Sequence, residues 1–111
     1  MRIVEHLIGG GRVSGGTRKK DIFNPSTGEV QAQVELGTPA DLDRAVELAK
    51  AAQPAWAATN PQKRARVMFE YKRLVESRMD ELAELLSSEH GKVVADARGD
   101  VQRGLAVIEF A

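Results

Sequence analysis

The sequence predicts an α+β protein in which short strands and β-hairpins come first and about four helices follow. Residues 1–37 are rich in glycine and carry stretches in which apolar and polar side chains alternate, as in strands. Over residues 38–111 the apolar side chains instead recur every three or four positions, which is the helical period. We therefore expect a β segment over residues 1–37 and a helical segment over residues 38–111.

The β segment should contain a hairpin and one longer strand. Short extended pieces at residues 6–8 and 12–13 flank three glycines, residues 9–11, which can adopt the positive φ that a tight hairpin turn requires. Asn24-Pro25 and Gly28 mark a second turn between extended pieces. Residues 30–36 alternate between apolar and polar side chains, so they are the clearest strand in the sequence.

The first helix should begin just after Gly37. Thr38 provides an N-cap hydroxyl, Pro39 fits the first helical position and Asp41 provides a carboxylate in the first turn. We expect this helix to end near Gln53-Pro54, because proline disrupts a helix interior. Trp56 would then lie on a short connector and pack as a plug against the helices.

Three further helices are predicted after this connector. Asn60-Pro61 repeats the start signal, and Asp80 marks the approximate start of a third helix that Gly91 ends with positive φ. The fourth has apolar residues at helical spacing, and no stop signal follows, so we expect it to be unfinished at Ala111. The apolar stripes of the second and fourth helices are Val67, Met68, Tyr71, Leu74 and Val75, and Val94, Ala97, Val101, Leu105 and Ile108.

Composition excludes several functions. Sixteen basic residues balance sixteen acidic ones, so no strong positive field favours a nucleic-acid partner. Cysteine is absent, which excludes disulfides, cysteine-type zinc sites and a thiol nucleophile within these residues. Neither a signal peptide nor an apolar run long enough for a membrane span is recognisable, so we expect a cytoplasmic protein without a membrane partner.

Motifs for cofactor, metal or nucleophile sites are not convincing. Residues 9–16 do not fit the Gly-x-Gly-x-x-Gly pattern of a dinucleotide-binding loop, and Val93 stands where a phosphate-binding loop needs Ser or Thr after Gly91-Lys92. His6 and His90 are the only histidines and lack the spacing of a metal site. We therefore predict no catalytic residue, no cofactor-binding residue and no metal ligand in the chain.

Arg103 is the one polar residue that suggests a binding role. Gly99 and Gly104 flank it on the fourth helix, and a glycine inside a helix destabilises it by about 1 kcal/mol relative to alanine. Close approach of a backbone or ligand would explain the glycines, and a guanidinium there could bind a carboxylate through two hydrogen bonds. The alternative is a surface ion pair between Asp100 and Arg103, which the residues alone favour because such pairs are common.

The sequence resembles the amino-terminal region of the aldehyde dehydrogenase superfamily. The similarity runs over residues 23–30, 45–56 and 64–69 and through Glu89-His90-Gly91-Lys92. Residues 95–104 and 107–111, which include Val101-Gln102-Arg103-Gly104, resemble the CoA-acylating methylmalonate-semialdehyde dehydrogenases of that superfamily.

This resemblance implies that the chain is an α+β fragment of the α/β aldehyde dehydrogenase fold. In the complete enzyme its helical segment would pack on the NAD-binding domain, and the enzyme would oxidise methylmalonate or malonate semialdehyde with NAD and coenzyme A. The catalytic cysteine and the cofactor site would lie outside these residues, so the chain alone is expected to be inactive and to bind no cofactor. A homo-oligomer is expected. The resemblance assigns Arg103 to the substrate's carboxylate.

One alternative from another class is a stand-alone helical interaction module, and nucleic-acid binding is a weaker one. If the chain is a fragment, its uncovered apolar surfaces should cause association of the isolated chain. We expect that association through the final helix and through the strand at residues 29–36.

Overall fold

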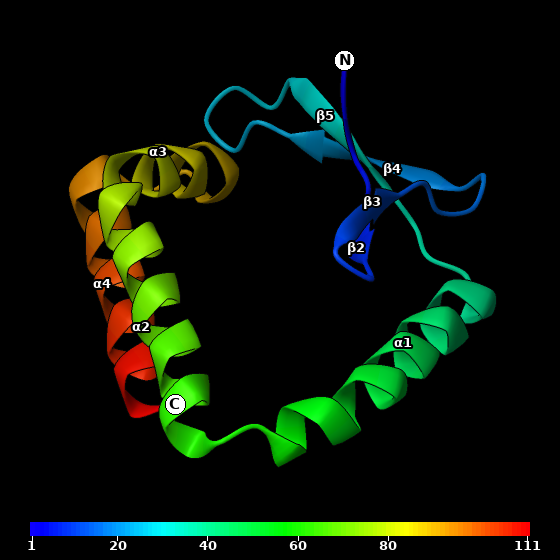
Figure 1. Ribbon diagram of the computed structural model, residues 1–111. Coiled ribbons are helices and arrows are strands. Elements are labelled where there is room, and N and C mark those ends of the chain that lie inside the picture. The colour runs from blue at the N-terminus through cyan, green and yellow to red at the C-terminus, as the bar shows by residue number, and fades with distance from the viewer. The chain divides into compact units, whose positions relative to one another are not determined.

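The computed structural model describes residues 1–111, which divide into two compact units, Met1–Ala58 and Thr59–Ala111. Every strand lies in the first unit together with one helix, and the second unit consists of three helices (Figure 1). Strands come first and four helices follow, so the predicted α+β class is confirmed.

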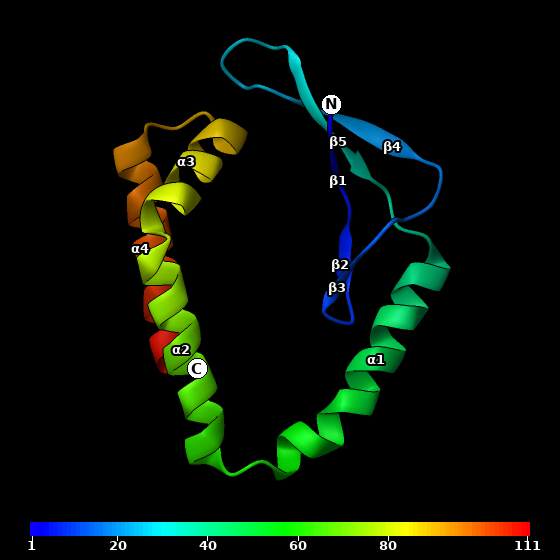
Figure 2. The same ribbon diagram turned by 45° about the horizontal axis from the view of Figure 1, so that its top comes forward.

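A three-stranded sheet forms the centre of the first unit. Strand β5 (Val30–Glu35) lies between β1 (Arg2–Val4), which runs parallel to it, and β4 (Lys19–Phe23), which runs antiparallel (Figure 2). Ala32 on β5 is fully buried, which confirms the predicted strand and its buried face. The parallel strand β1 was not predicted. Both edges of β5 are therefore paired within the sheet, and association of the isolated chain through residues 29–36 stays a prediction.

The predicted hairpin is present as β2 (His6–Ile8) and β3 (Gly11–Val13). Gly9 and Gly10 have φ of 64° and 80°, and positive φ at both central residues is the conformation that a tight two-residue hairpin turn needs. A Cβ at Gly9 would lie 2.9 Å from Cδ1 of Leu48, so the turn packs closely on the helix of this unit.

Helix α1 (Pro39–Ala58) begins as predicted but ends later. Asp41 accepts hydrogen bonds from the backbone N–H and the hydroxyl of Thr38, both at 2.7 Å, and its own N–H donates to that hydroxyl at 3.2 Å. The expected end near Gln53-Pro54 is wrong, because the helix continues through Pro54 for another turn. Proline removes a single backbone donor, and the residues that follow resume the helix. Trp56 is consequently a helical residue, 45% exposed, and the predicted plug on a connector is also wrong.

The second unit contains α2 (Pro61–Ser77), α3 (Met79–His90) and α4 (Val94–Phe110). The side chain of Asn60 accepts a 2.8 Å hydrogen bond from the N–H of Gln62, which confirms it as the N-cap of α2. Gly91 caps the end of α3 with φ of 86°, as predicted. The three helices therefore begin within a residue or two of their expected starts, and α3 ends where Gly91 predicted.

The core of the second unit is small. Ala83 on α3 and Ala97 and Leu105 on α4 are its buried residues, and α4 packs against both other helices. Of the stripe on α4, Ala97 and Leu105 are buried, whereas Val94 is 44% exposed. The stripe on α2 is only partly covered, since Val67 and Tyr71 are 53% and 52% exposed.

Candidate functional site

The segment between α3 and α4 places Lys92 beside Asp100 of α4, which also pairs with Arg103. Gly91 reverses the chain at the end of α3, and Ser87 Oγ then donates a 2.7 Å hydrogen bond to the carbonyl of Lys92. Lys92 is thereby held two residues before the start of α4, and its ammonium forms an ion pair with Asp100 on that helix.

Asp100 lies between two cations. Its Oδ2 accepts a hydrogen bond from Lys92 Nζ, and its Oδ1 accepts one of 2.5 Å from Arg103 Nη1. The hydrogen bond from Lys92 is the main cause that lowers the pKa of Asp100 below its ordinary value. Desolvation opposes this shift, whereas the charges of Lys92, Arg103 and His90 add to it. The carboxylate is therefore ionised at neutral pH.

Arg103 is exposed, with 80% of its side chain accessible to solvent. The pair with Asp100 that the residues alone favoured is present, three residues apart on one helix. A Cβ at Gly99 or Gly104 would meet nothing within 4 Å, so no other part of the chain approaches these two glycines closely. Carboxylate binding by Arg103 stays a prediction.

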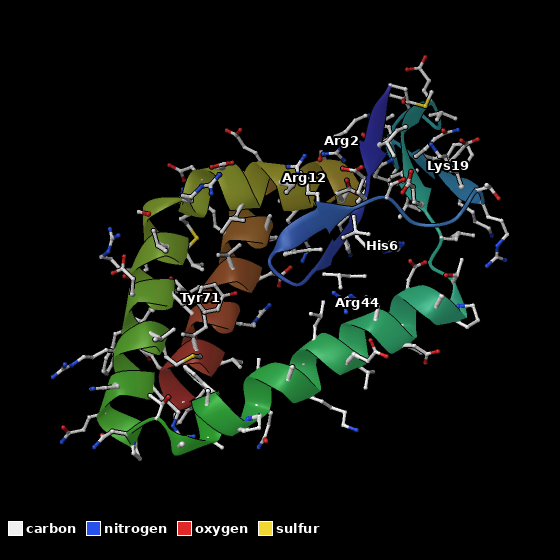
Figure 3. The ribbon with its side chains drawn as sticks, turned by 45° about the vertical axis from the view of Figure 1, so that its right-hand side comes forward. Arg2, His6, Arg12, Lys19, Arg44 and Tyr71 are labelled. Atoms are coloured by element: carbon white, nitrogen blue, oxygen red, sulfur yellow. The ribbon has the colours of Figure 1, made fainter.

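An apolar groove on the second unit was not predicted from the sequence. It has a volume of about 760 Å³ and is formed between α2 and α4, with Leu82 of α3 at one side. Tyr71 projects from α2 toward α4 in this region (Figure 3), and Gly104 contributes to the opposite wall. The helical stripe of α2 was the available signal, but periodicity identifies an apolar face without showing whether anything covers it.

A polar network in the first unit was also missed. Glu35 is only 5% exposed, and it accepts hydrogen bonds from the backbone N–H of Gly15 at 2.6 Å and from Ser14 Oγ at 3.0 Å. Lys19 Nζ lies 3.5 Å from the same carboxylate. These donors link the segment after β3 to the end of β5.

His6 lies beside this network. Its Nε2 is buried and has no hydrogen-bond partner, and a Cβ at Gly15 would lie 2.8 Å from its Cδ2. Figure 3 shows His6 on the hairpin and Arg44 on α1, the two elements that line a small pocket of this unit. His90 lies at the end of α3 in the other unit.

Metal-binding and membrane-spanning features are not found. No three side chains among His, Cys, Asp and Glu are grouped so that they could hold a metal ion. None of the four helices combines the length and the apolar character that crossing a bilayer requires. The glycines at residues 9–11 belong to a β-hairpin rather than to a strand–loop–helix unit.

Comparison with known proteins gives a consistent family. Residues 13–111 match the model of the aldehyde dehydrogenase family. Malonate-semialdehyde dehydrogenase of Pseudomonas aeruginosa is 42% identical over 111 residues, covering the whole chain and 22% of that protein. Malonate-semialdehyde dehydrogenase 2 of Oceanobacillus iheyensis is 44% identical over 112 residues, again covering the whole chain and 23% of that protein.

Solved structures agree in fold. The crystal structure of methylmalonate-semialdehyde dehydrogenase from Oceanimonas doudoroffii matches with a TM-score of 0.96 and 43% identity, over 99% of the chain and 22% of that structure. A Sinorhizobium meliloti protein, described as a candidate methylmalonate-semialdehyde dehydrogenase and solved with NAD, matches with a TM-score of 0.96 and 58% identity. That match covers 99% of the chain and 23% of the solved structure. The chain thus spans less than a quarter of the length of these relatives.

Proposed function

Since this chain belongs to the aldehyde dehydrogenase family, we propose that it is the amino-terminal part of an NAD-dependent methylmalonate- or malonate-semialdehyde dehydrogenase. The similarity to enzymes of those two names, at 42% to 44% identity over the whole chain, supports this choice within the family. The reaction would convert the semialdehyde to an acyl-CoA, with NAD as the oxidant. We further propose that the enzyme is a cytoplasmic homo-oligomer.

The residues of this chain do not themselves supply the chemistry of that reaction. The sequence has no cysteine for a thiolate nucleophile, and its glycine cluster forms a hairpin turn. Neither NAD nor coenzyme A has a fitting site among these residues, so no catalytic step is assigned to them. We propose that the isolated chain is inactive and binds neither cofactor, and that its helices support the NAD-binding domain.

Arg103 is the residue that we propose contacts the substrate. Malonate semialdehyde carries a carboxylate at the end opposite its aldehyde, and a guanidinium is the side chain best suited to bind a carboxylate through two parallel hydrogen bonds. The single observation that carries this assignment is that Arg103 uses Nη1 for Asp100 while the rest of its highly exposed guanidinium has no acceptor.

The test is a comparison of two aldehydes in the complete enzyme. Arg103→Leu should lower kcat/KM for malonate semialdehyde by roughly 30- to 100-fold, because it removes a charged hydrogen-bonding group. The same variant should leave kcat/KM for propanal, which has no carboxylate, nearly unchanged. Arg98→Leu is the matched control, since Arg98 also lies on α4 and pairs with Asp80. Equal losses for both aldehydes would contradict the carboxylate role.

Inactivity of the isolated chain has its own test. Malonate semialdehyde, NAD and coenzyme A are mixed with the 111-residue chain, and NADH is followed by absorbance. Turnover above the background would contradict the proposal.

A stand-alone interaction module is the second candidate, and the apolar groove on the second unit favours it. It predicts a stable, specific assembly of the isolated chain. Sedimentation that reveals one defined oligomer, together with the absence of dehydrogenase activity in the complete gene product, would favour the module over the enzyme.

A further inference from the structure

The geometry points to Asp100 as a positioning residue that presents the free edge of Arg103 to the substrate's carboxylate, with Lys92 limiting how Asp100 can bind the guanidinium. This inference rests on the proposed function of Arg103 as the carboxylate-binding residue. It assigns to two further side chains a part in substrate specificity.

The first step of the argument is the way in which Asp100 shares its two oxygens. Oδ2 is occupied by Lys92 Nζ, and Oδ1 accepts from Arg103 Nη1. Each oxygen is engaged by a different cation, and the carboxylate does not form two parallel hydrogen bonds with the guanidinium. Nε and Nη2 of Arg103, the edge that binds a carboxylate in a bidentate way, are left without an acceptor.

Two other arginines in this unit bind a glutamate three residues away through two nitrogens. Arg73 donates through Nε and Nη2 to the two carboxylate oxygens of Glu70, at 2.9 and 2.6 Å. Arg78 binds Glu81 in the same bidentate manner, at 2.8 and 2.6 Å. These pairs are also three residues apart, yet their bidentate edges are already occupied. Among these three pairs, only Arg103 is bound through a single nitrogen and keeps that edge open.

The second step concerns order and charge. An exposed arginine samples many rotamers, and a hydrogen bond at one nitrogen restricts them without closing the opposite edge. The side chains of Lys92 and Asp100 are 24% and 31% exposed, whereas that of Arg103 is 80% exposed. The Lys92–Asp100 pair is therefore more confined than the arginine that it binds. The three side chains together carry one net positive charge, which favours an anionic substrate. Without Lys92 the remaining pair would be neutral.

The test uses three variants in the complete enzyme with malonate semialdehyde and propanal. Asp100→Glu keeps the charge but lengthens the side chain by one methylene, which allows the bidentate pairing that Glu70 makes with Arg73, so it should raise KM for malonate semialdehyde roughly tenfold. Asp100→Asn and Lys92→Met should each raise that KM about threefold to tenfold. For all three, kcat for malonate semialdehyde and both constants for propanal should stay within about twofold of the wild type.

The controls separate this inference from the proposed function. Asp80→Asn removes the acidic partner of another arginine on α4, Arg98, and should leave KM unchanged. Propanal turnover shows that each variant is folded. Wild-type KM in all three variants, or equal losses for both aldehydes, would overturn the positioning role even if Arg103→Leu remained selective. If Arg103→Leu itself were not selective, the proposed carboxylate site would fail, and this inference with it.

Discussion

The carboxylate of Glu35, the last residue of β5, accepts a 2.6 Å hydrogen bond from the backbone N–H of Gly15, twenty residues earlier in the chain. Ser14 Oγ donates to the same carboxylate, and Lys19 on β4 adds a positive charge. The side chain of Glu35 on the central strand thus accepts a hydrogen bond from a backbone N–H in the loop after β3. The relationship connects both ends of the β3–β4 segment to β5.

We predict that Glu35→Gln destabilises the protein, because one of the two carboxylate oxygens becomes an amide nitrogen that cannot accept these hydrogen bonds. The expected decrease in Tm is about 5 °C in thermal unfolding followed by circular dichroism. Glu29→Gln is the matched control, since Glu29 lies in an exposed turn and its replacement should leave Tm unchanged. Equal Tm values for the two variants would contradict the structural role of Glu35.

A pH dependence follows from the same contacts. The hydrogen bond from Gly15 is the main cause that lowers the pKa of Glu35 in the folded state, and the contacts with Ser14 and Lys19 add to it. A carboxylate with a lowered pKa contributes stability above its unfolded-state pKa, and this contribution is lost as pH falls through the folded-state pKa. Wild type should therefore lose its Tm advantage over Glu35→Gln between neutral pH and pH values below the ordinary glutamate range. A difference that does not depend on pH would contradict this linkage.

Gly91 and Gly99 should respond to alanine in opposite directions. Gly91 caps α3 with φ of 86°, so Gly91→Ala should destabilise the chain by about 1 kcal/mol. Gly99 lies inside α4 with nothing within 4 Å of an added Cβ, so Gly99→Ala should stabilise it by about 0.5–1 kcal/mol. Urea unfolding of the isolated chain at low concentration measures both changes. Destabilisation by both variants would show that Gly99 has a close neighbour.

Leu105 and Val107 lie on the same helix but differ in burial. Leu105 is 1% exposed, so Leu105→Ala should lower the free energy of unfolding by about 2–4 kcal/mol. Val107 is 69% exposed, and Val107→Ala should change it by less than about 0.5 kcal/mol. Urea unfolding gives both values, and a large loss in Val107→Ala would mean that this face of α4 is covered.

The isolated chain should associate through the exposed end of α4. Phe110 is 93% exposed and Val107 lines the apolar groove, so replacing both with serine should shift the chain toward monomer in light scattering. Ala106→Ser is the control, because Ala106 is exposed but small and lies outside the groove. A monodisperse monomer of the unmodified chain would contradict the prediction.

Local signals explain which elements could be predicted. Asn60-Pro61, Gly91 and the hairpin glycines act on neighbouring backbone, so their positions mark the turns and helix ends that the structure contains. The pairing of β1 with β5 depends instead on residues about thirty positions apart, and the short β1 has no periodic pattern of its own. The helix end predicted at Pro54 was wrong because a proline weakens a helix locally but does not determine whether the next turn forms.

The candidate site could be predicted only in part. Arg103 and its pair with Asp100 follow from helical spacing, which brings residues three apart onto one face. The hydrogen bond from Lys92 could not be derived in that way, because it crosses the turn that Gly91 makes between two helices. The apolar groove depends on which parts of α2 and α4 remain uncovered, and that is a property of tertiary packing.

The parallel pairing of β1 with β5 has a consequence for biosynthesis. Arg2 is matched with Ala32 and Val4 with Val34, so β1 leaves the ribosome well before its partner strand has been made. The nascent chain must hold this strand unpaired while the hairpin, whose strands are adjacent in sequence, is free to close. Because the central strand β5 follows β1 and β4 in the chain, neither of these strands can pair in the sheet until β5 has been made.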